Sequence, residues 1–375
     1  MKSQQRALAI FLLGKKGGAT LFQDITIERL LELREKKEFS LVDVRSPSEF
    51  NEHTIPGSIN IPLFTDEERA EVGTLYKQVS VEAAKARGLE IVSAKLPAFI
   101  KSFQELSRDV VVFCWRGGMR SKTAATVIDL MGVHSYRLQG GFRTYRQWVI
   151  HQLETIELAQ EAIVLNGYTG SNKTVILQQL KQEGLPVLDL EGMANHRGSI
   201  FGQIGLEPHN QKTFDSLLVS EMEKLPSSPY FLMEGESKRI GKVLLPDILL
   251  KKKESGHQLF IHMPIEERVQ HILADYSPWD HHDECVEAFH LIKRRIHTPA
   301  AAKTEEALQT GNYAEAVELL LTYYYDPLYE RTAMQYKDEQ TIDLYVKNTE
   351  DAMVKVKEFW QKKSRTALKN EAKEL

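Results

Sequence analysis

Short apolar runs rich in β-branched residues alternate with segments of helical periodicity along the first half of the chain. One run leads directly into Cys114, another ends just before Gly140 and Gly141, and residues 123–131 between them have helical spacing. Strands that alternate with helices indicate βαβ units and a parallel sheet. The predicted strands cover residues 41–44, 109–113 and 135–138.

A second alternation begins after residue 150. Residues 152–162 contain helix formers without Gly or Pro, so they predict a connecting helix and a domain boundary close to its start. The apolar run 162–165 then leads into a glycine-rich turn and a helix from about Thr174. Further predicted strands cover residues 187–190, 230–233 and 259–263.

The last part of the chain is expected to be helical. Pro264, followed by Glu266 and Glu267, predicts a helix start, because proline fits the first turn and acids favour the positive end of the helix dipole. Beyond about residue 300 we predict helices alone. The charge-rich tail 355–375 is expected to fray.

These patterns predict an α/β protein of two domains, which a length of 375 residues also favours. Each domain is expected to contain a parallel sheet, and the second to end in a helical region. The predicted divisions are an N-terminal extension at 1–19, a first domain at 20–150, a connecting helix at 151–161 and a second domain at 162–375.

Composition narrows the class of protein. Apolar residues make up 42% and charged residues 27% of the chain, as in ordinary globular proteins. The net charge of −4 disfavours a protein that coats RNA nonspecifically, but it allows an enzyme that docks one RNA through a local basic face. The two cysteines, Cys114 and Cys285, make no disulfide framework and indicate a reducing cytosol.

The apolar run Ala7–Leu13 is too short to span a bilayer. Lys2 and Arg6 precede it, as in a signal peptide, but no clear small-residue cleavage pattern follows. We therefore expect a cytoplasmic protein with no membrane partner, in which this run forms a surface strand or a short helix.

A candidate catalytic loop, residues 114–121, follows one predicted strand and precedes a helix. Its cysteine, Cys114, therefore lies at the carboxyl end of a strand, where open α/β sheets bind ligands. The Gly-Gly pair allows backbone N–H groups to converge on an anion, while the arginines and the helix N-terminus favour the thiolate and an anionic adduct on sulfur. The residues assigned to a donor anion are Arg116, Gly117, Gly118 and Arg120.

A candidate phosphate loop, residues 167–174, follows a second strand and opens a helix. It matches the P-loop pattern G-x-x-x-x-G-K-[ST] except at Asn172, where glycine is expected. Asparagine tolerates positive φ better than other side chains, so we expect the loop to form. Lys173 is expected to meet phosphate oxygens, and Thr174 a metal ion or a phosphate. The predicted phosphate-binding residues are Gly167, Thr169, Gly170, Ser171, Asn172, Lys173 and Thr174.

An acid that assists such a loop should end a neighbouring strand. The strand predicted at 230–233 is followed by Glu234 and Glu236, and either is a candidate. Potential metal ligands gather separately at His281, His282, Cys285 and His290, but their spacing fits no common zinc pattern. We interpret them as a polar helix start, and we expect no metal site and no tightly bound cofactor.

The first half of the chain, over residues 20–150, resembles rhodanese domains. Such domains carry sulfur or selenium on the cysteine of a loop like 114–121, as a persulfide or its selenium analogue. The resemblance implies that Asp43 and Arg45 stabilise the fold and take no part in catalysis. The segments that carry the resemblance, besides that loop, are 43–45, 49–50, 53–62 and 138–142.

With the second half included, residues 20–330 resemble the tRNA 2-selenouridine synthases. The chain departs from the family pattern at Asn172 and at Gly235, where an acidic residue is expected. Both departures concern phosphate or metal binding. The additional segments that carry the likeness are 189–199, 236–241, 293–295 and 324–329.

The resemblance implies replacement of sulfur by selenium at C2 of 2-thiouridine, at the wobble position of the tRNA anticodon loop. Selenophosphate would be the selenium donor, and geranyl diphosphate would give an S-geranylated intermediate. Cys114 is then expected to serve the selenium step, and residues 167–174 to hold a phosphate or diphosphate. The expected contacts to tRNA phosphates are His196, Arg197, Lys293, Arg294 and Arg295.

Two alternatives remain open at the level of sequence. The chain could be a general rhodanese-type sulfurtransferase whose second domain binds a nucleotide, since that protein would use the same Cys114 chemistry. It could also be a non-catalytic module that docks tRNA through an altered phosphate loop, as Asn172 suggests. ATP, selenophosphate and geranyl diphosphate all present phosphate oxygens to residues 167–174.

Overall fold

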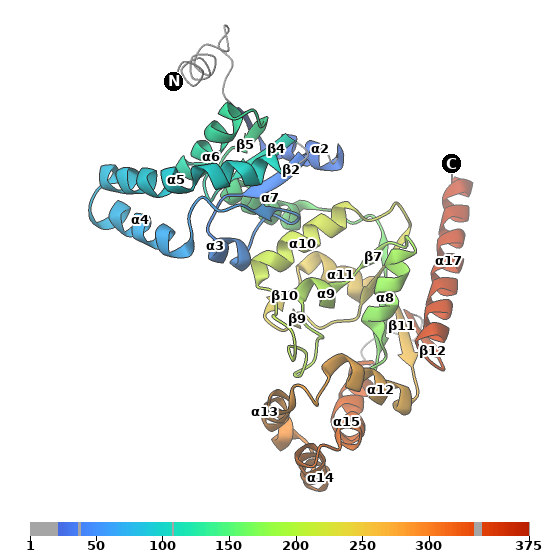
Figure 1. Cartoon of the computed structure of the whole chain (residues 1–375). Helices are drawn as coiled ribbons and strands as arrows, with labels where there is room; N and C mark the ends of the chain where they lie inside the picture. Colours follow the sequence, from blue (N-terminus) through green and yellow to red (C-terminus); the bar gives the residue numbers. More distant parts are fainter. Residues whose placement is uncertain (1–21, 37–38, 107–108, 334–339, 375) are drawn as a thin grey trace, which may run out of the picture. The chain divides into compact units, whose positions relative to one another are not determined.

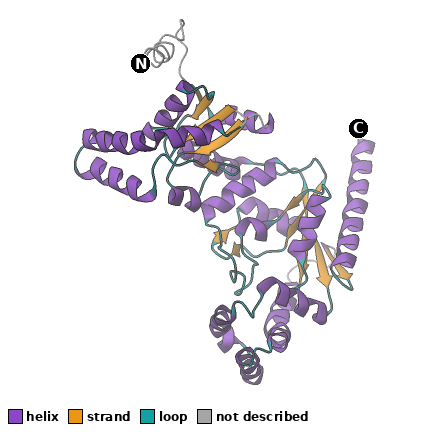
Figure 2. Ribbon diagram, in the orientation of Figure 1, coloured by secondary structure: helices purple, strands orange, loops and turns teal. Residues whose placement is uncertain are grey.

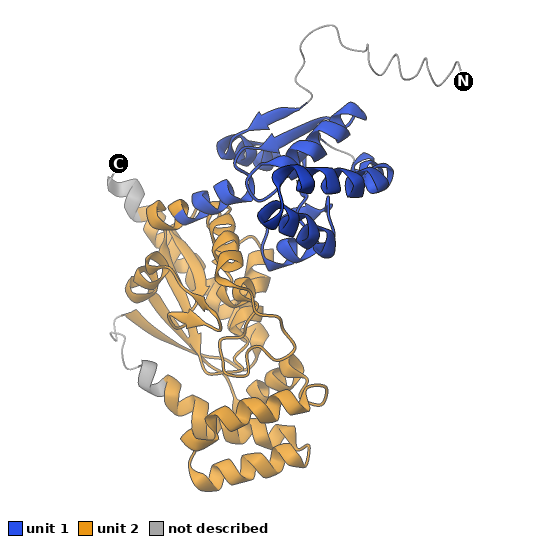
Figure 3. Cartoon of the chain, turned by 90° about the vertical axis from the view of Figure 1, so that its left-hand side faces the viewer, with its two compact units in different colours: residues 1–150 blue, residues 151–375 orange. Residues whose placement is uncertain are grey.

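The computed structural model describes residues 22–36, 39–106, 109–333 and 340–374. The chain divides into two compact units, residues 1–150 and 151–375 (Figure 3). Each unit contains a five-stranded parallel sheet with helices on its faces (Figure 2), so the predicted α/β class is confirmed. The extension at 1–19, including the run Ala7–Leu13, lies outside the described residues.

The sheet of the first unit has the order β1-β5-β4-β2-β3, with β4 at its centre. The predicted strands at 109–113 and 135–138 coincide with β4 and β5, and the run at 41–44 overlaps β2. The strands are β1 (Gln23–Ile25), β2 (Phe39–Asp43), β3 (Ile59–Asn60), β4 (Asp109–Phe113) and β5 (Ser135–Leu138). The helices are α2 (Ile27–Lys36), α3 (Pro47–Glu52), α4 (Asp66–Gln78), α5 (Val81–Gln104), α6 (Met119–Leu130) and α7 (Gly141–Thr155).

Asp43, the last residue of β2, forms a buried ion pair with Arg45, with 2.6 Å between Oδ2 and Nη2. The same Nη2 donates to the carbonyl of His53 at 2.6 Å, and Thr54 Oγ1 donates to Asp43 at 2.9 Å. A buried charge pair is tolerated when further hydrogen bonds satisfy both partners, as here. The arrangement ties the strand end to the following turn and fits the structural role implied for both residues.

Helices α4 and α5 lie side by side as a hairpin inserted between β3 and β4 (Figure 1). Thr65 and Glu68 form a capping box at the start of α4, and Ser80 accepts from the Ala83 N–H at the start of α5. Such caps satisfy backbone donors that a helix start leaves unpaired. The hairpin is an addition to the sheet that the sequence patterns did not single out.

The sheet of the second unit has the order β12-β11-β6-β8-β7, again with all pairs parallel. A short antiparallel pair, β9 and β10, lies outside it. The strands are β6 (Glu161–Gly167), β7 (Val187–Leu188), β8 (Tyr230–Glu234), β9 (Arg239–Ile240), β10 (Val243–Leu244), β11 (His257–His262) and β12 (Thr341–Tyr345). The helices are α8 (Lys173–Gln182), α9 (Leu190–Ala194), α10 (Gln211–Glu223), α11 (Asp247–Ser255), α12 (Ile265–Tyr276), α13 (His282–Ile292), α14 (Thr298–Gln309), α15 (Tyr313–Leu320), α16 (Asp326–Ala333) and α17 (Thr349–Glu374).

Three predictions about these elements were wrong in part. The helix expected at 152–162 is the end of α7, which stops at Thr155, and β6 begins at Glu161. The strand expected at 187–190 ends at Leu188, because Asp189 caps α9 through the Gly192 N–H. The region beyond residue 300 is not wholly helical, since β12 pairs in parallel with β11.

The tail expected to fray is instead helical through Glu374 as α17. Val356 is buried against the sheet, and Trp360 Nε1 donates to the carbonyl of Tyr230 at 3.2 Å. The apolar face of α17 therefore completes one side of the second sheet. Across the described ranges, every helix is too short or too polar to cross a bilayer.

Helices α12 to α15 pack around an apolar cluster of their own within the second unit. Between α15 and α16 the chain makes a π-helical turn, Leu321–Tyr325. Such turns place one extra residue in a helix and often occur at functional sites. This one overlaps, at residues 324 and 325, the segment 324–329, whose likeness to a family was noted from the sequence.

Candidate functional site

The cysteine loop lies at the carboxyl end of the central strand β4 of the first sheet. Gly117, Gly140 and Gly141 all have positive φ, at 63°, 68° and 61°. A Cβ atom on Gly141 would lie 2.2 Å from the carbonyl oxygen of Cys114, so glycine is required where the two turns meet. The Phe142 N–H donates to that carbonyl at 2.9 Å, which fixes the backbone of the cysteine.

The Cys114 sulfur lies 3.2 Å from the hydroxyl of Ser121 on the first turn of α6. The residue is 4% exposed and packs with Val112 and Ala124, so the thiol is nearly closed off from solvent. It is not surrounded by hydrocarbon alone, because Ser121 provides a hydroxyl and two arginines lie within electrostatic reach. A donor molecule therefore reaches the sulfur only when the loop opens.

The arginines at the thiol differ from the predicted pair. Burial by itself would lower the pKa of Arg120. The hydrogen bonds and the negative charge of Glu49 outweigh this effect and raise the pKa above its ordinary value, and Cys114 makes a smaller contribution in the same direction. Arg116, the other predicted residue, has an exposed side chain.

Arg137 on β5 takes the second position and was missed from the sequence. Its Nη1 donates to the carbonyl of Gly117 at 2.9 Å. A two-pronged ion pair with Asp24 raises the pKa of Arg137 above its ordinary value, and Cys114 adds to the shift. No sequence motif marks Arg137, because its place beside the loop arises only when β5 pairs with β4.

The phosphate loop lies at the carboxyl end of β6, the central strand of the second sheet. Strand order reverses on the two sides of β6, which is where doubly wound sheets bind ligands. Asn172 has φ 54° and ψ 29°, so it adopts the left-handed conformation expected of it. Its Nδ2 donates to Thr349 Oγ1 at 3.0 Å, which helps to offset the strain.

The loop opens into a cavity of about 300 Å³. Lys173 extends its ammonium over the loop and donates to the Gly167 carbonyl at 3.2 Å, near where a phosphate would lie. Of the predicted phosphate-binding residues all except Gly167 line the cavity. The remaining polar lining comes from Gln178, Glu191, Asn195, His196, Arg197, Ser199, Glu236, Asp275, Tyr276 and Tyr329.

Two carboxylates, Glu191 and Glu236, face each other in this cavity. Burial, then the neighbouring Glu236, raise the pKa of Glu191 to about 8, while Lys173 partly opposes the shift. The hydroxyl of Thr174 donates a hydrogen bond to Glu191 Oε2. Glu191 belongs to the segment 189–199, so its sequence signal was present, but its role was not predicted.

Of the two candidate acids, Glu236 reaches the cavity and Glu234 does not line it. Glu234 is fully buried at the end of β8, and burial raises its pKa well above the ordinary value. Its Oε2 accepts from the Leu190 N–H at 2.8 Å, while Oε1 has no hydrogen-bond partner among the described residues. We therefore assign Glu234 to holding α9 in place.

The glycine at position 235 has a structural explanation. A Cβ atom there would lie 2.0 Å from the side-chain oxygen of Asn166 on β6. An acidic residue would therefore displace Asn166, whose amide donates to Gln258 at 2.8 Å. Glu191 and Glu236 supply the carboxylates that Gly235 does not.

The predicted tRNA contacts fall into two groups. His196 and Arg197 line the phosphate cavity; His196 is buried, and Arg197 lies over the ring of Tyr276 with Cζ 4.8 Å from its centroid. Residues 293–295 form a separate turn after α13. There Lys293 pairs with Glu305 at 2.6 Å, whereas Arg294 and Arg295 are exposed.

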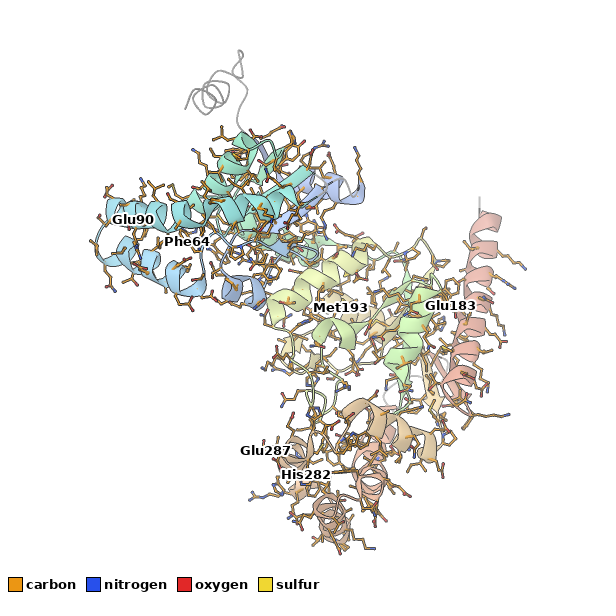
Figure 4. All side chains as sticks on the ribbon, viewed as in Figure 1. Phe64, Glu90, Glu183, Met193, His282 and Glu287 are labelled. Carbon is orange, nitrogen blue, oxygen red and sulfur yellow. The ribbon has the colours of Figure 1, made fainter. Side chains whose placement is uncertain are left out.

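A divalent cation fits the phosphate cavity only together with substrate oxygens. Thr174, Glu191 and Glu236 offer the oxygen ligands that Mg²⁺ takes alongside phosphates. Within the described ranges no group of three or more His, Cys, Asp or Glu side chains is arranged to hold a metal by itself. His282 starts α13, as the polar helix start predicted, and burial raises the pKa of Cys285 to about 11 (Figure 4 labels His282).

An apolar cavity of about 60 Å³ adjoins the phosphate cavity. Thr169, Ser199, Ile272 and Tyr276 line both, so the two share a wall. Burial raises the pKa of Tyr276 above its ordinary value. The rest of the apolar lining comes from Phe201, Pro278, Cys285, Leu308, Tyr313, Ala316, Val317, Leu320, Leu321 and Tyr325.

Comparison with known proteins identifies relatives of both units. The model of the tRNA 2-selenouridine synthase AAA domain matches residues 160–366, and the model of the rhodanese-like domain matches residues 26–147. A tRNA 2-selenouridine synthase from Bdellovibrio bacteriovorus is 33% identical over 338 residues, which is 78% of this chain and 89% of that protein.

Two further relatives with the same name come from Nitrosomonas europaea and Nitrosomonas eutropha. They are 34% and 35% identical over 244 residues, or 63% of this chain and 63% and 62% of their own lengths. A solved N-terminal domain of a putative ATP/GTP binding protein from Clostridium difficile 630 is 37% identical, with a TM-score of 0.32, over 34% of this chain and 99% of that one.

Proposed function

The chain belongs to the tRNA 2-selenouridine synthase family, and from this premise we propose that it replaces sulfur by selenium at C2 of wobble 2-thiouridine in tRNA. Selenophosphate is the proposed selenium donor, and geranyl diphosphate activates the sulfur first. The phosphate loop of the second unit serves the geranyl step, and Cys114 of the first unit serves the selenium step.

In the first step the thiocarbonyl sulfur attacks C1 of geranyl diphosphate. A carbon–sulfur bond forms, the carbon–oxygen bond to diphosphate breaks, and the N3 proton of the base leaves with the diphosphate. In this proposal Lys173, whose ammonium lies over the loop, and the backbone N–H groups of the loop hold the departing charge. Any bound Mg²⁺ would supply further charge compensation beside Thr174, Glu191 and Glu236.

The observation that carries this assignment is the apolar cavity that adjoins the phosphate cavity. A nucleotide needs a site for a polar base and ribose, whereas a prenyl diphosphate needs phosphate donors beside an apolar wall. The cavity of about 60 Å³ holds part of a ten-carbon chain. The π-helical turn Leu321–Tyr325 in its wall is where we expect it to widen for the rest.

In the second step selenium adds at C2 and geranyl thiol leaves. S-geranyl uridine, selenophosphate and water then give 2-selenouridine, geranyl thiol and phosphate, which balances atoms and electrons. Alkylation makes sulfur a better leaving group, so the two steps must occur in this order. In this proposal Arg120 and Arg137, which both interact electrostatically with Cys114, hold the anionic donor beside it.

Mass spectrometry of wobble nucleosides tests the proposal. Thiolated tRNA should gain a geranyl group with geranyl diphosphate alone, and selenium only after selenophosphate is added as well. Thiosulfate offered in place of selenophosphate tests the rival assignment, a general sulfurtransferase. Turnover of thiosulfate without any selenated tRNA would refute the proposal, and turnover of any donor would exclude a non-catalytic docking module.

A further inference from the structure

The first unit contains a large apolar groove of its own, which the proposed steps do not use. It has a volume of about 590 Å³, within the range of small-molecule sites, and lies between α4, α5 and the start of α6. Phe64, which lines it, is labelled beside this hairpin in Figure 4. The apolar lining comes from Leu63, Phe64, Val72, Tyr76, Val81, Ala84, Leu89, Val92 and Met119.

Large apolar side chains on the groove are unusually exposed. Tyr76 is 62% exposed, Leu89 68% and Met119 62%. Soluble proteins rarely leave such side chains together in water unless they contact a ligand or partner. The groove therefore has the character of a binding surface.

Its charged residues are all cationic. Arg69, Lys77, Lys85 and Arg120 line the groove, and no acidic residue does so among the described residues. Glu49 pairs with Arg69 and Arg120, which leaves the lysines to give the rim its positive character. An apolar trough with a cationic rim suits a ligand with an apolar chain attached to a polyanion.

A glycine, Gly88, contributes to the lining of the groove. Gly88 on α5 faces the ring of Phe64, and a Cβ atom on Gly88 would lie 3.5 Å from Phe64 Cζ. A larger side chain at position 88 would therefore occupy space in the groove. Beside the groove, Arg87 on α5 pairs with Glu71 on α4 at 2.7 Å, so an ion pair links the two helices there.

The groove is continuous with the cysteine loop. Met119 and Arg120 belong both to its wall and to the loop 114–121. Phe64 and Val92 from the groove pack in the same apolar cluster as Cys114. A ligand in the groove therefore lies against the elements that position the thiol.

We propose that this groove binds the prenyl chain of S-prenylated 2-thiouridine in tRNA while C2 of the base is at the cysteine loop. The inference rests on the proposed function, in which the alkylated sulfur must leave at Cys114 after the chain has left the phosphate loop. Burying the chain holds the leaving group at the thiol, and Lys77 and Lys85 meet the nearby RNA phosphates.

Two variants test the groove without touching the thiol. Tyr76→Ser with Leu89→Ser removes exposed apolar contacts, and Gly88→Leu fills the trough. Leu291→Ser, at a residue 69% exposed on α13, is the matched control. The substrates are tRNAs with S-geranyl or S-methyl 2-thiouridine at the wobble position, and single-turnover selenation is measured for each.

We expect both groove variants to lower selenation of the S-geranyl tRNA about tenfold or more and to leave the S-methyl tRNA within twofold of the parent. The control variant should keep the parental preference, and thermal unfolding should show that each variant folds. Parental geranyl-over-methyl preference in both groove variants would overturn the inference, and it would favour a protein partner for this surface.

A binding measurement separates this inference from the proposed function. S-geranyl-2-thiouridine 5′-monophosphate is titrated calorimetrically into the Cys114→Ala protein, with and without Gly88→Leu. Weaker binding with Gly88→Leu supports the groove even if no tRNA is selenated. Equal binding by the two proteins overturns it, even if the proposed reaction is confirmed.

Discussion

The cysteine loop and the phosphate loop have the same position in two different sheets, yet they suit different ligands. Each follows the central strand of a five-stranded parallel sheet and precedes a helix. At the cysteine loop, both nearby arginines are paired with carboxylates and the thiol is nearly closed. At the phosphate loop, Lys173 faces a cavity of about 300 Å³ that contains two carboxylates.

The difference shows how surroundings, more than loop position, determine the chemistry of an anion site. Arginines held by Glu49 and Asp24 present a fixed positive field to one sulfur atom, which suits a compact anion. The phosphate cavity has room, an apolar neighbour and acids that suit a larger diphosphate with a cation. The predictions below test this contrast, from the largest expected effect to the smallest.

Cys114→Ala should lower selenation of S-geranyl tRNA about 1,000-fold or more, because it removes the thiol to which we assign the selenium step. Geranylation of thiolated tRNA should stay at the parent rate. Both are measured from nucleoside mass spectra after timed reactions. Cys285→Ala is the control for selenation, and selenation by Cys114→Ala at the parental rate would show that the thiol has been misassigned.

Lys173→Ala should lower geranylation about 100-fold, the usual cost of removing one donor to a developing anion. Selenation of tRNA already carrying the S-geranyl group should change less than twofold. Lys181→Ala on the same helix α8, where Lys181 pairs with Glu221, is the matched control. If both steps fall equally, the two loops do not divide the reaction.

Arg137→Ala should lower selenation about tenfold and Arg116→Ala less than threefold. Arg137 hydrogen-bonds the loop and adds charge beside sulfur, whereas Arg116 is exposed. Initial rates at several selenophosphate concentrations would show the loss of Arg137 chiefly as weaker donor binding. The reverse ranking of the two variants would restore the residue chosen from the sequence.

Glu191→Gln should make the protein more stable than the parent at high pH. The Glu191 pKa is raised from 4.5 to about 8 in the fold, so folding takes up a proton between these values and parental stability falls as pH rises through them. The variant lacks this loss and should be more stable by about 2–4 kcal/mol at pH 8.5, but not at pH 4. Urea unfolding across this range measures it, and parallel pH profiles of the two proteins would count against it.

Asn172→Gly should change the free energy of unfolding by less than about 1 kcal/mol. Glycine relieves the cost of φ 54°, but it also removes the bond to Thr349 and loosens the unfolded chain. Asn172→Ala neither relieves the positive φ nor keeps the hydrogen bond to Thr349, so it should lower the free energy of unfolding by about 1–2 kcal/mol. Thermal unfolding of the three proteins checks the order, and an alanine variant as stable as the parent would contradict it.

The sequence indicated the α/β class, the two loops and most strands, because these features are local. A run such as Val110–Phe113 is buried on both faces and therefore apolar throughout. The loop motifs require particular backbone shapes over eight residues, so glycine and Asn172 mark them directly. For the same reason the helix start after Pro264 was predicted correctly.

Features that depend on pairing between distant segments were missed. Strand β12 is a half-exposed edge strand that exists because it pairs with β11, about 80 residues earlier in the chain. Arg137 comes to the thiol through the pairing of β5, and Glu191 meets Glu236 through the packing of α9 on β8. No local sequence pattern predicts either of these contacts.

The sequence by itself determined which residues have the chemistry, a thiol beside arginines and a lysine in a glycine-rich turn. Only the tertiary structure decided which charges are already paired, which acid reaches the phosphate cavity, and where apolar space lies beside each loop. The physical reason is that backbone conformation depends on neighbouring residues, whereas electrostatic environment and cavity shape depend on side chains that the fold brings together from afar.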